Sequence, residues 1–164
     1  MRKFFVLAVV GVLMAIGANA QKIGYVNANE LLATMPEMVK ANKDLEAYAK
    51  TFEDTYKTMG TELQTKFEAY NKTGKTLTDA VREAKESEIA ALQKRVSEYE
   101  QSSQDKIEAK RNELVKPVLD KAQKAIKEYA AANGYDYILN AESVLFAKDS
   151  DNVTPQLKTK LGAK

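Results

Sequence analysis

The 164-residue sequence contains no cysteine and no histidine. Without cysteine the chain has no disulfide framework and no thiol chemistry, and without histidine it lacks the commonest general base and metal ligand. These two absences exclude Ser-His and Cys-His catalysis and most zinc sites. We therefore predict that the protein is not an enzyme, and we assign no catalytic residue, cofactor or metal site.

Long apolar runs are also scarce, and the clearest one, at residues 4–16, lies near the N-terminus. Arg2 and Lys3 precede this run, and a small-residue cleavage site ends at Ala20, which is the pattern of an export signal over residues 1–20. A bilayer core needs roughly 20 apolar residues, so the run is short for a membrane span, although an uncleaved anchor is the alternative. No cysteine follows the site, which excludes a lipid anchor. We expect a mature protein that begins at Gln21, is soluble, and lies in the periplasm.

The expected mature chain has no excess of either positive or negative charge. The full sequence has 25 basic and 23 acidic residues, and residues 1–20 hold two of the basic ones and none of the acidic ones, so cleavage leaves 23 of each. A neutral balance does not support nucleic acid or acidic lipid as the main partner. At most, transient contact with a membrane surface is expected.

A helical pattern dominates the middle of the chain. Apolar residues recur at steps of three and four, which predicts a long amphipathic helix with one narrow stripe. The helix begins at Pro36, meets turn-forming residues at 71–75, and is followed by a second helix that is capped by Thr78 and ends at Asn133-Gly134. The stripe comprises Leu45, Tyr48, Phe52, Tyr56, Met59, Leu63, Phe67 and Tyr70.

The two helices are expected to form an antiparallel hairpin centred near Lys75. Their lengths are roughly 54 Å and roughly 80 Å at 1.5 Å per residue. Folding about residue 75 places Pro117 beside residue 33, where a kink is expected, and sets Gly60 opposite residues 90 and 91. We interpret Gly60 as a site of close helix packing, with a flexible point in the arm as the alternative.

Short strands occur only near the two ends. The sequence predicts one strand in residues 22–27 and two strands, joined by a turn, in residues 134–150. Asn27 begins a short helix, and Thr154 is predicted to cap a last helix with Pro155 at its first position. The predicted body comprises residues 21–36 and 117–164, and residues 37–116 form the arm. So small a sheet has exposed edges, and several copies that join their sheets would cover them.

Two segments carry a resemblance to a known family. KIGYVNANELLATMPE and the C-terminal GYDYIL…VLFA…DNVTPQL resemble the Skp/OmpH family of periplasmic chaperones. The resemblance implies an α+β fold in which a long helical hairpin projects from a small β body that is completed by trimerisation. It further implies that three arms enclose a cavity, which holds unfolded outer-membrane proteins without ATP and delivers them toward the outer-membrane assembly machinery. The body residues implied are Ile23, Tyr25, Val26, Tyr137, Leu139, Val144 and Phe146.

The aromatic stripe has two open interpretations. It can be the seam between the helices, or its lower part can face a cavity, because the hairpin centred at residue 75 sets Leu45 and Tyr48 against the polar segment 101–106. Amphipathic Tyr and adaptable Met side chains would suit weak contacts with an unfolded client. The candidate client contacts are Leu45, Tyr48, Phe52, Tyr56 and Met59.

Basic residues outnumber acidic ones around the predicted tip. They are Lys66, Lys72, Lys75, Arg82 and Lys85. They are interpreted either as ordinary surface charge or as a patch that steers anionic clients or membrane surfaces over about 8–10 Å. The sequence thus favours a trimeric holdase chaperone, and the alternative is a structural coiled-coil spacer or adaptor of the cell envelope.

Overall fold

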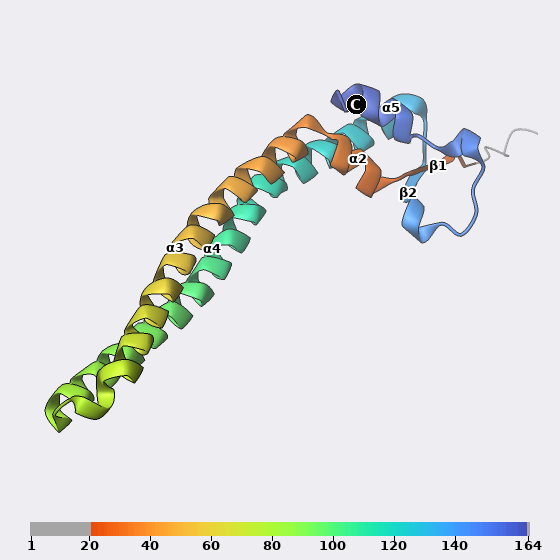
Figure 1. The fold of residues 1–164 in the computed structure, drawn as a ribbon. Coiled ribbons are helices and arrows are strands. Elements are labelled where there is room, and N and C mark those ends of the chain that lie inside the picture. Colours follow the sequence, from red (N-terminus) through yellow and green to blue (C-terminus); the bar gives the residue numbers. More distant parts are fainter. Residues whose placement is uncertain (1–20, 164) are drawn as a thin grey trace, which may run out of the picture. The chain divides into compact units, whose positions relative to one another are not determined.

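The computed structural model describes residues 21–163, so the predicted export signal at 1–20 lies outside the described residues. Helices form most of the described chain, and a two-stranded sheet completes it (Figure 1). The predicted α+β class with a long helical hairpin is confirmed. In order, the elements are β1 (Ile23–Val26), α2 (Ala28–Thr34), α3 (Pro36–Thr73), η1 (Gly74–Thr76), α4 (Asp79–Asn133), β2 (Tyr137–Asn140), η2 (Ala141–Ser143), η3 (Asp149–Asp151) and α5 (Thr154–Leu161).

The chain divides into two compact units. Leu32–Ala122 make up one, which we call the arm unit, and of the described residues, 21–31 together with 123–163 make up the other, the head unit. The division at residues 31 and 122 differs from the predicted body and arm bounds at 36 and 117, which stay a prediction.

The arm unit is an antiparallel pairing of α3 with the first part of α4, which run side by side in Figure 1. The seam is thin, because each helix offers one narrow apolar stripe to the other. Polar and aromatic contacts cross the hairpin along its length: the ring centroids of Phe52 and Tyr99 lie 6.2 Å apart, and Lys66 Nζ lies 2.5 Å from Glu88 Oε1. The buried apolar residues of the arm unit are Met35, Ala41, Ile89, Leu92, Val118 and Ala122.

The pairing of the two helices differs from the predicted one. Pro117 lines a groove with Lys40, Ala41 and Asp44 rather than lying beside residue 33, and Gly60 shares a notch with Gln93 rather than facing residues 90 and 91. The predicted centre was wrong because α3 does not stop at residue 71 but continues to Thr73, which moves the turn to residues 74–78. α4 continues without interruption through Pro117.

Helix ends mostly follow the local sequence. Asn27 Oδ1 accepts a hydrogen bond from Glu30 N (3.0 Å) at the start of α2, Pro36 is the first residue of α3, and Gly134 has φ +66° just after α4. These three predicted boundaries are confirmed. The predicted cap of α5 was wrong: Thr154 is already the first helical residue, and its hydroxyl accepts a hydrogen bond from Asn27 N (2.9 Å) instead.

The head unit is built around β1. This strand pairs in parallel with β2, Ile23 opposite Tyr137 and Val26 opposite Asn140, and Tyr25 forms a bridge with Asn152 on the other side. Gly24 is required here because a Cβ atom at this position would lie 2.8 Å from the Tyr135 ring. The apolar core of the head unit comprises Val26, Leu31, Ala125, Val153, Leu157 and Leu161.

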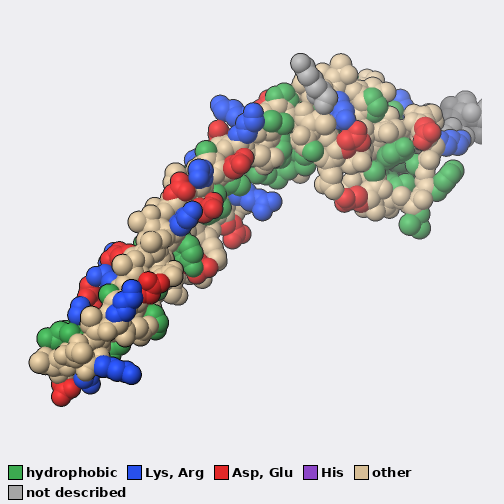
Figure 2. Space-filling view, viewed as in Figure 1, with side chains coloured by type: hydrophobic (Ala, Val, Ile, Leu, Met, Phe, Trp, Pro, Cys, Tyr) green, Lys and Arg blue, Asp and Glu red, His purple; other side chains and the backbone are tan. Residues whose placement is uncertain are grey.

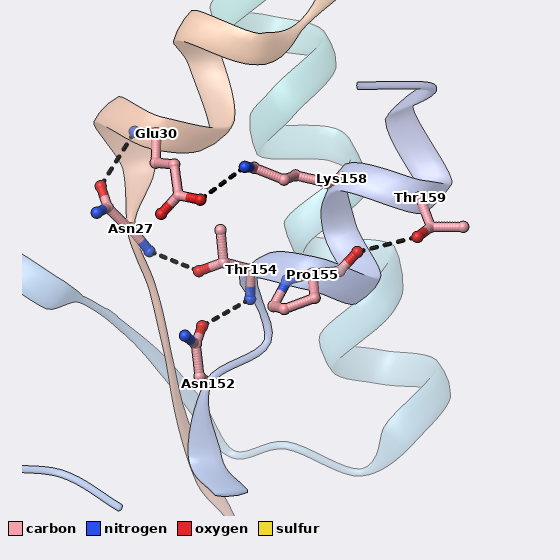
Figure 3. Close-up of polar contacts among 7 residues, drawn as sticks. All are labelled: Asn27, Glu30, Asn152, Thr154, Pro155, Lys158 and Thr159. Carbon is pink, nitrogen blue, oxygen red and sulfur yellow. Dashed lines mark hydrogen bonds and ion pairs between the residues drawn. The ribbon is translucent and has the colours of Figure 1, made fainter. Parts of the chain in front are cut away.

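Polar contacts fasten α5 within the head unit (Figure 3). Lys158 Nζ lies 2.6 Å from Glu30 Oε1, and Lys160 Nζ lies 2.8 Å from Glu128 Oε2. The Lys158–Glu30 pair and the Asn27–Thr154 hydrogen bond join two segments that the sequence separates by more than a hundred residues, whereas the Lys160–Glu128 pair joins α5 to α4.

One predicted strand does not form. Residues 144–148 follow the short turn η2 but pair with no other strand of the described chain, so the expected hairpin in residues 134–150 is wrong. Two apolar side chains in this segment, Leu145 and Phe146, are 107% and 86% exposed. The segment has the composition of a strand, yet it pairs neither with β1, which is bordered on both sides, nor with the free edge of β2.

Candidate functional surfaces

The aromatic stripe lies on the side of α3 that faces α4, yet it is only partly covered. Tyr48 and Phe52 meet edge to face with centroids 5.0 Å apart, and Phe52 also contacts Tyr99 across the hairpin. Four of the five candidate contacts are half-buried, and Tyr56 is 41% exposed. These side chains therefore serve the seam on one side and reach solvent on the other, and their role as client contacts stays a prediction.

A notch on the arm unit adds residues that the sequence prediction missed. It lies between Phe52 and Tyr56 on α3 and Ser103 and Ile107 on α4, and its volume is about 160 Å³. Ser103 is buried, and its hydroxyl donates to Tyr99 O (2.6 Å), so a small side chain stands where a large one would close the seam. The short polar run 101–106 was the sequence signal, but it was assigned to the wrong part of α3.

Polar contacts close the tip of the hairpin. Tyr70 Oη donates to Glu86, and Arg82 donates to the carbonyl oxygens of Gly74 (3.3 Å) and Leu77 (3.4 Å). Arg82 also lies 3.4 Å from Asp79. The hydrogen bond from Tyr70 to Glu86 raises the pKa of the Tyr70 hydroxyl.

Two of the five predicted basic tip residues, Lys66 and Arg82, already pair with other groups of the same chain. Lys66 pairs with Glu88, which raises the pKa of the Lys66 ammonium and lowers that of the Glu88 carboxyl, mainly through their hydrogen bond. Arg82 holds the turn. The remaining cations, Lys72, Lys75 and Lys85, take part in no ion pair within the described residues. A steering role for the tip stays a prediction.

Exposed apolar side chains gather in the head unit, as Figure 2 shows for the face in view. Among the predicted body residues, Ile23, Tyr137 and Leu139 are 46%, 53% and 43% exposed. Tyr25 and Val144 are half-buried, whereas Val26 is buried within the single chain. Phe146 and its neighbour Leu145 are the most exposed large apolar residues of the described chain. Their assignment to an intersubunit body stays a prediction.

Between residues 21 and 163, none of the helices combines the length and the apolar character that a membrane span requires. The same part of the chain brings together no group of three or more His, Cys, Asp or Glu side chains that could hold a metal ion.

Comparison with protein families places this arrangement among known proteins. Residues 22–161 match the family described as outer membrane protein (OmpH-like). The chain belongs to the Skp/OmpH family of chaperones. This confirms the resemblance carried by the two terminal segments, and the family is a chaperone family rather than an enzyme family.

Individual members of the Skp/OmpH family match this chain over nearly its whole length. Chaperone protein Skp of Photorhabdus luminescens is 28% identical over 157 residues, which cover 94% of this chain and 95% of that protein. Chaperone protein Skp of Yersinia enterocolitica is 27% identical over 156 residues, with the same coverage. The crystal structure of an OmpH-like outer membrane chaperone from Caulobacter crescentus has the same fold, with a TM-score of 0.76, 14% identity, and coverage of 88% of this chain and 86% of that one.

Proposed function

We propose that this Skp/OmpH chaperone is an ATP-independent holdase of the periplasm. Three copies join through their head units, and their arms enclose a space in which an unfolded outer-membrane protein is held until it reaches the assembly machinery. Full-length similarity to proteins named Chaperone protein Skp supports this proposal.

The observation that carries the proposal is the unfinished surface of the head unit. β2 is an edge strand of a two-stranded sheet, and the strand-like segment 144–148 exposes both Leu145 and Phe146 to solvent. A single copy has no means of covering this free strand edge and this exposed apolar pair. A second copy has the matching edge and the matching segment, because both copies have the same sequence.

The arm unit supports the holding of a client. Half-buried aromatic side chains occur along a rod that also displays many Lys, Arg, Asp and Glu side chains, so each contact with an unfolded chain is weak while the charges oppose aggregation of the rod itself. Several weak contacts made at once by linked arms give useful retention with rapid release.

Two measurements on the mature chain test the proposal. Light scattering after size-exclusion chromatography should give the mass of a trimer. A urea-denatured β-barrel protein that is diluted into buffer should aggregate less in its presence, with no nucleotide added. A folded monomer that stays monomeric at high concentration would rule the proposal out. A trimer that does not suppress aggregation would favour the structural spacer or adaptor of the envelope instead.

A further inference from the structure

The notch on the arm unit has the dimensions of one aromatic ring. Its volume is about 160 Å³, and its apolar lining, which we call the floor, comprises Ala49, Phe52, Tyr56 and Ile107. A cavity of about 150 Å³ lined by apolar side chains is known to bind benzene. The notch is open to solvent along the arm, so a side chain of another polypeptide can enter it without any rearrangement of the two helices.

The rim of the notch is acidic. Glu53 on α3 and Glu100 on α4 both line the notch, one from each helix, and neither takes part in an ion pair within residues 21–163. Lys106 Nζ lies 6.0 Å from the centroid of the Phe52 ring and offsets only part of this charge. The larger notch beside Gly60 differs, because no charged residue lines it.

We propose that this acidic-rimmed notch binds an aromatic side chain of an unfolded client that has a Lys or Arg residue next to it in sequence. The ring contacts the apolar floor, and the neighbouring cation lies against the carboxylates of Glu53 and Glu100. The inference rests on the proposed holdase function and adds a preference to it: aromatic residues flanked by basic residues are held more strongly than those flanked by acidic ones.

The absence of tryptophan from this protein gives the test a clean signal. Two capped peptides, one with a central Lys-Trp-Lys and one with a central Glu-Trp-Glu, are titrated with the mature protein while tryptophan emission is followed. The basic peptide should bind with a shift of emission to shorter wavelength, and the acidic peptide should bind more weakly. The difference should shrink as salt is added, because the carboxylates are exposed.

Two variants test whether binding takes place in the notch. Ala49→Leu fills the floor and should weaken binding of the basic peptide at least about tenfold. The double variant Glu53→Gln/Glu100→Gln should weaken it by about 1.4- to 5-fold for each carboxylate removed. The matched control Glu46→Gln/Glu83→Gln removes two other exposed carboxylates of the arm unit and should leave binding unchanged. Circular dichroism establishes that each variant keeps its helices.

The outcomes separate the notch from the proposed function. Equal binding of both peptides, or binding of the basic peptide that survives Ala49→Leu and the double variant, would overturn the notch inference. Suppression of aggregation by the unaltered protein is measured alongside. If suppression is present while the variants bind the basic peptide normally, only the notch inference fails. If suppression is absent, the holdase function fails whatever the peptides do.

Discussion

Replacing Phe146 by serine is the sharpest test of assembly through the head unit. The side chain is 86% exposed in the single chain, next to Leu145, which is fully exposed. It makes little contact within its own copy, so its loss should leave the head unit folded. If three copies bury it against one another, the loss is felt only in the assembled state.

The expected effect can be estimated from that exposure. Burial of a whole Phe side chain is worth about 1.5–3 kcal/mol, so roughly 2 kcal/mol per copy amounts to roughly 6 kcal/mol per trimer. This corresponds to about four powers of ten in the equilibrium constant between monomer and trimer. Because the concentration at half-assembly varies as the square root of that constant, it should rise about 100-fold.

Light scattering over a dilution series measures the concentration at half-assembly directly. Phe67→Ser is the matched control, because Phe67 is also exposed, at 49%, but belongs to the arm unit. We expect the control to assemble like the unaltered protein. An unchanged half-assembly concentration for Phe146→Ser, with the variant still folded, would refute the reasoning that the exposed segment lies between copies.

Three further predictions concern stability. Gly24→Ala should destabilise the head unit by about 1–3 kcal/mol in urea unfolding, because the added methyl overlaps the Tyr135 ring, and the additional change Tyr135→Ala should recover part of the loss. Gly60→Ala should stabilise the arm unit by about 0.5–1 kcal/mol, since no atom lies within 4 Å of the added methyl, whereas Gly134→Ala, at φ +66°, should destabilise. The melting temperature should be steady near neutral pH and fall as the pH drops below 4.5, the ordinary pKa of glutamate, because hydrogen bonds to lysine lower the folded-state pKa of three carboxyls. These three carboxyls are those of Glu37, Glu88 and Glu128. A melting temperature that does not fall in acid would contradict the prediction that these carboxyls stabilise the fold.

Local signals in the sequence were sufficient for the elements that local interactions determine. The start of α3 depends on the fixed φ of Pro36, and the end of α4 depends on the free φ of Gly134. Each boundary is therefore signalled by the identity of a single residue. The cap of α5 was misplaced because the Thr154 hydroxyl, which could have capped the helix, is used by Asn27 N from the other end of the chain. A hydrogen bond between residues so far apart in the sequence produces no local pattern from which it could be predicted.

The third strand shows a different limit. Residues 144–148 have the composition of a strand. Predicting a strand from composition assumes that an edge of the sheet pairs with the segment. In the single chain β1 is bordered on both sides, by β2 and by the bridge at Asn152, so it offers no edge. The outer edge of β2 is free, yet residues 144–148 do not pair with it, and Leu145 and Phe146 remain exposed. A strand-like composition therefore does not by itself show which edge, if any, a segment pairs with.

The register of the hairpin explains why the notch was missed. A stripe with steps of three and four nearly repeats after seven residues, so sliding one helix by a heptad restores almost the same apolar contacts. Features that do not repeat set the register: the short turn at residues 74–78 and, near the tip, the Lys66–Glu88 pair and the Tyr70–Glu86 hydrogen bond. Because those contacts bring Ser103 and Ile107 opposite Phe52 and Tyr56, the polar tip also determines where the small side chain leaves a space in the seam. The position of the notch in the arm thus depends on residues several helical turns away that do not line it.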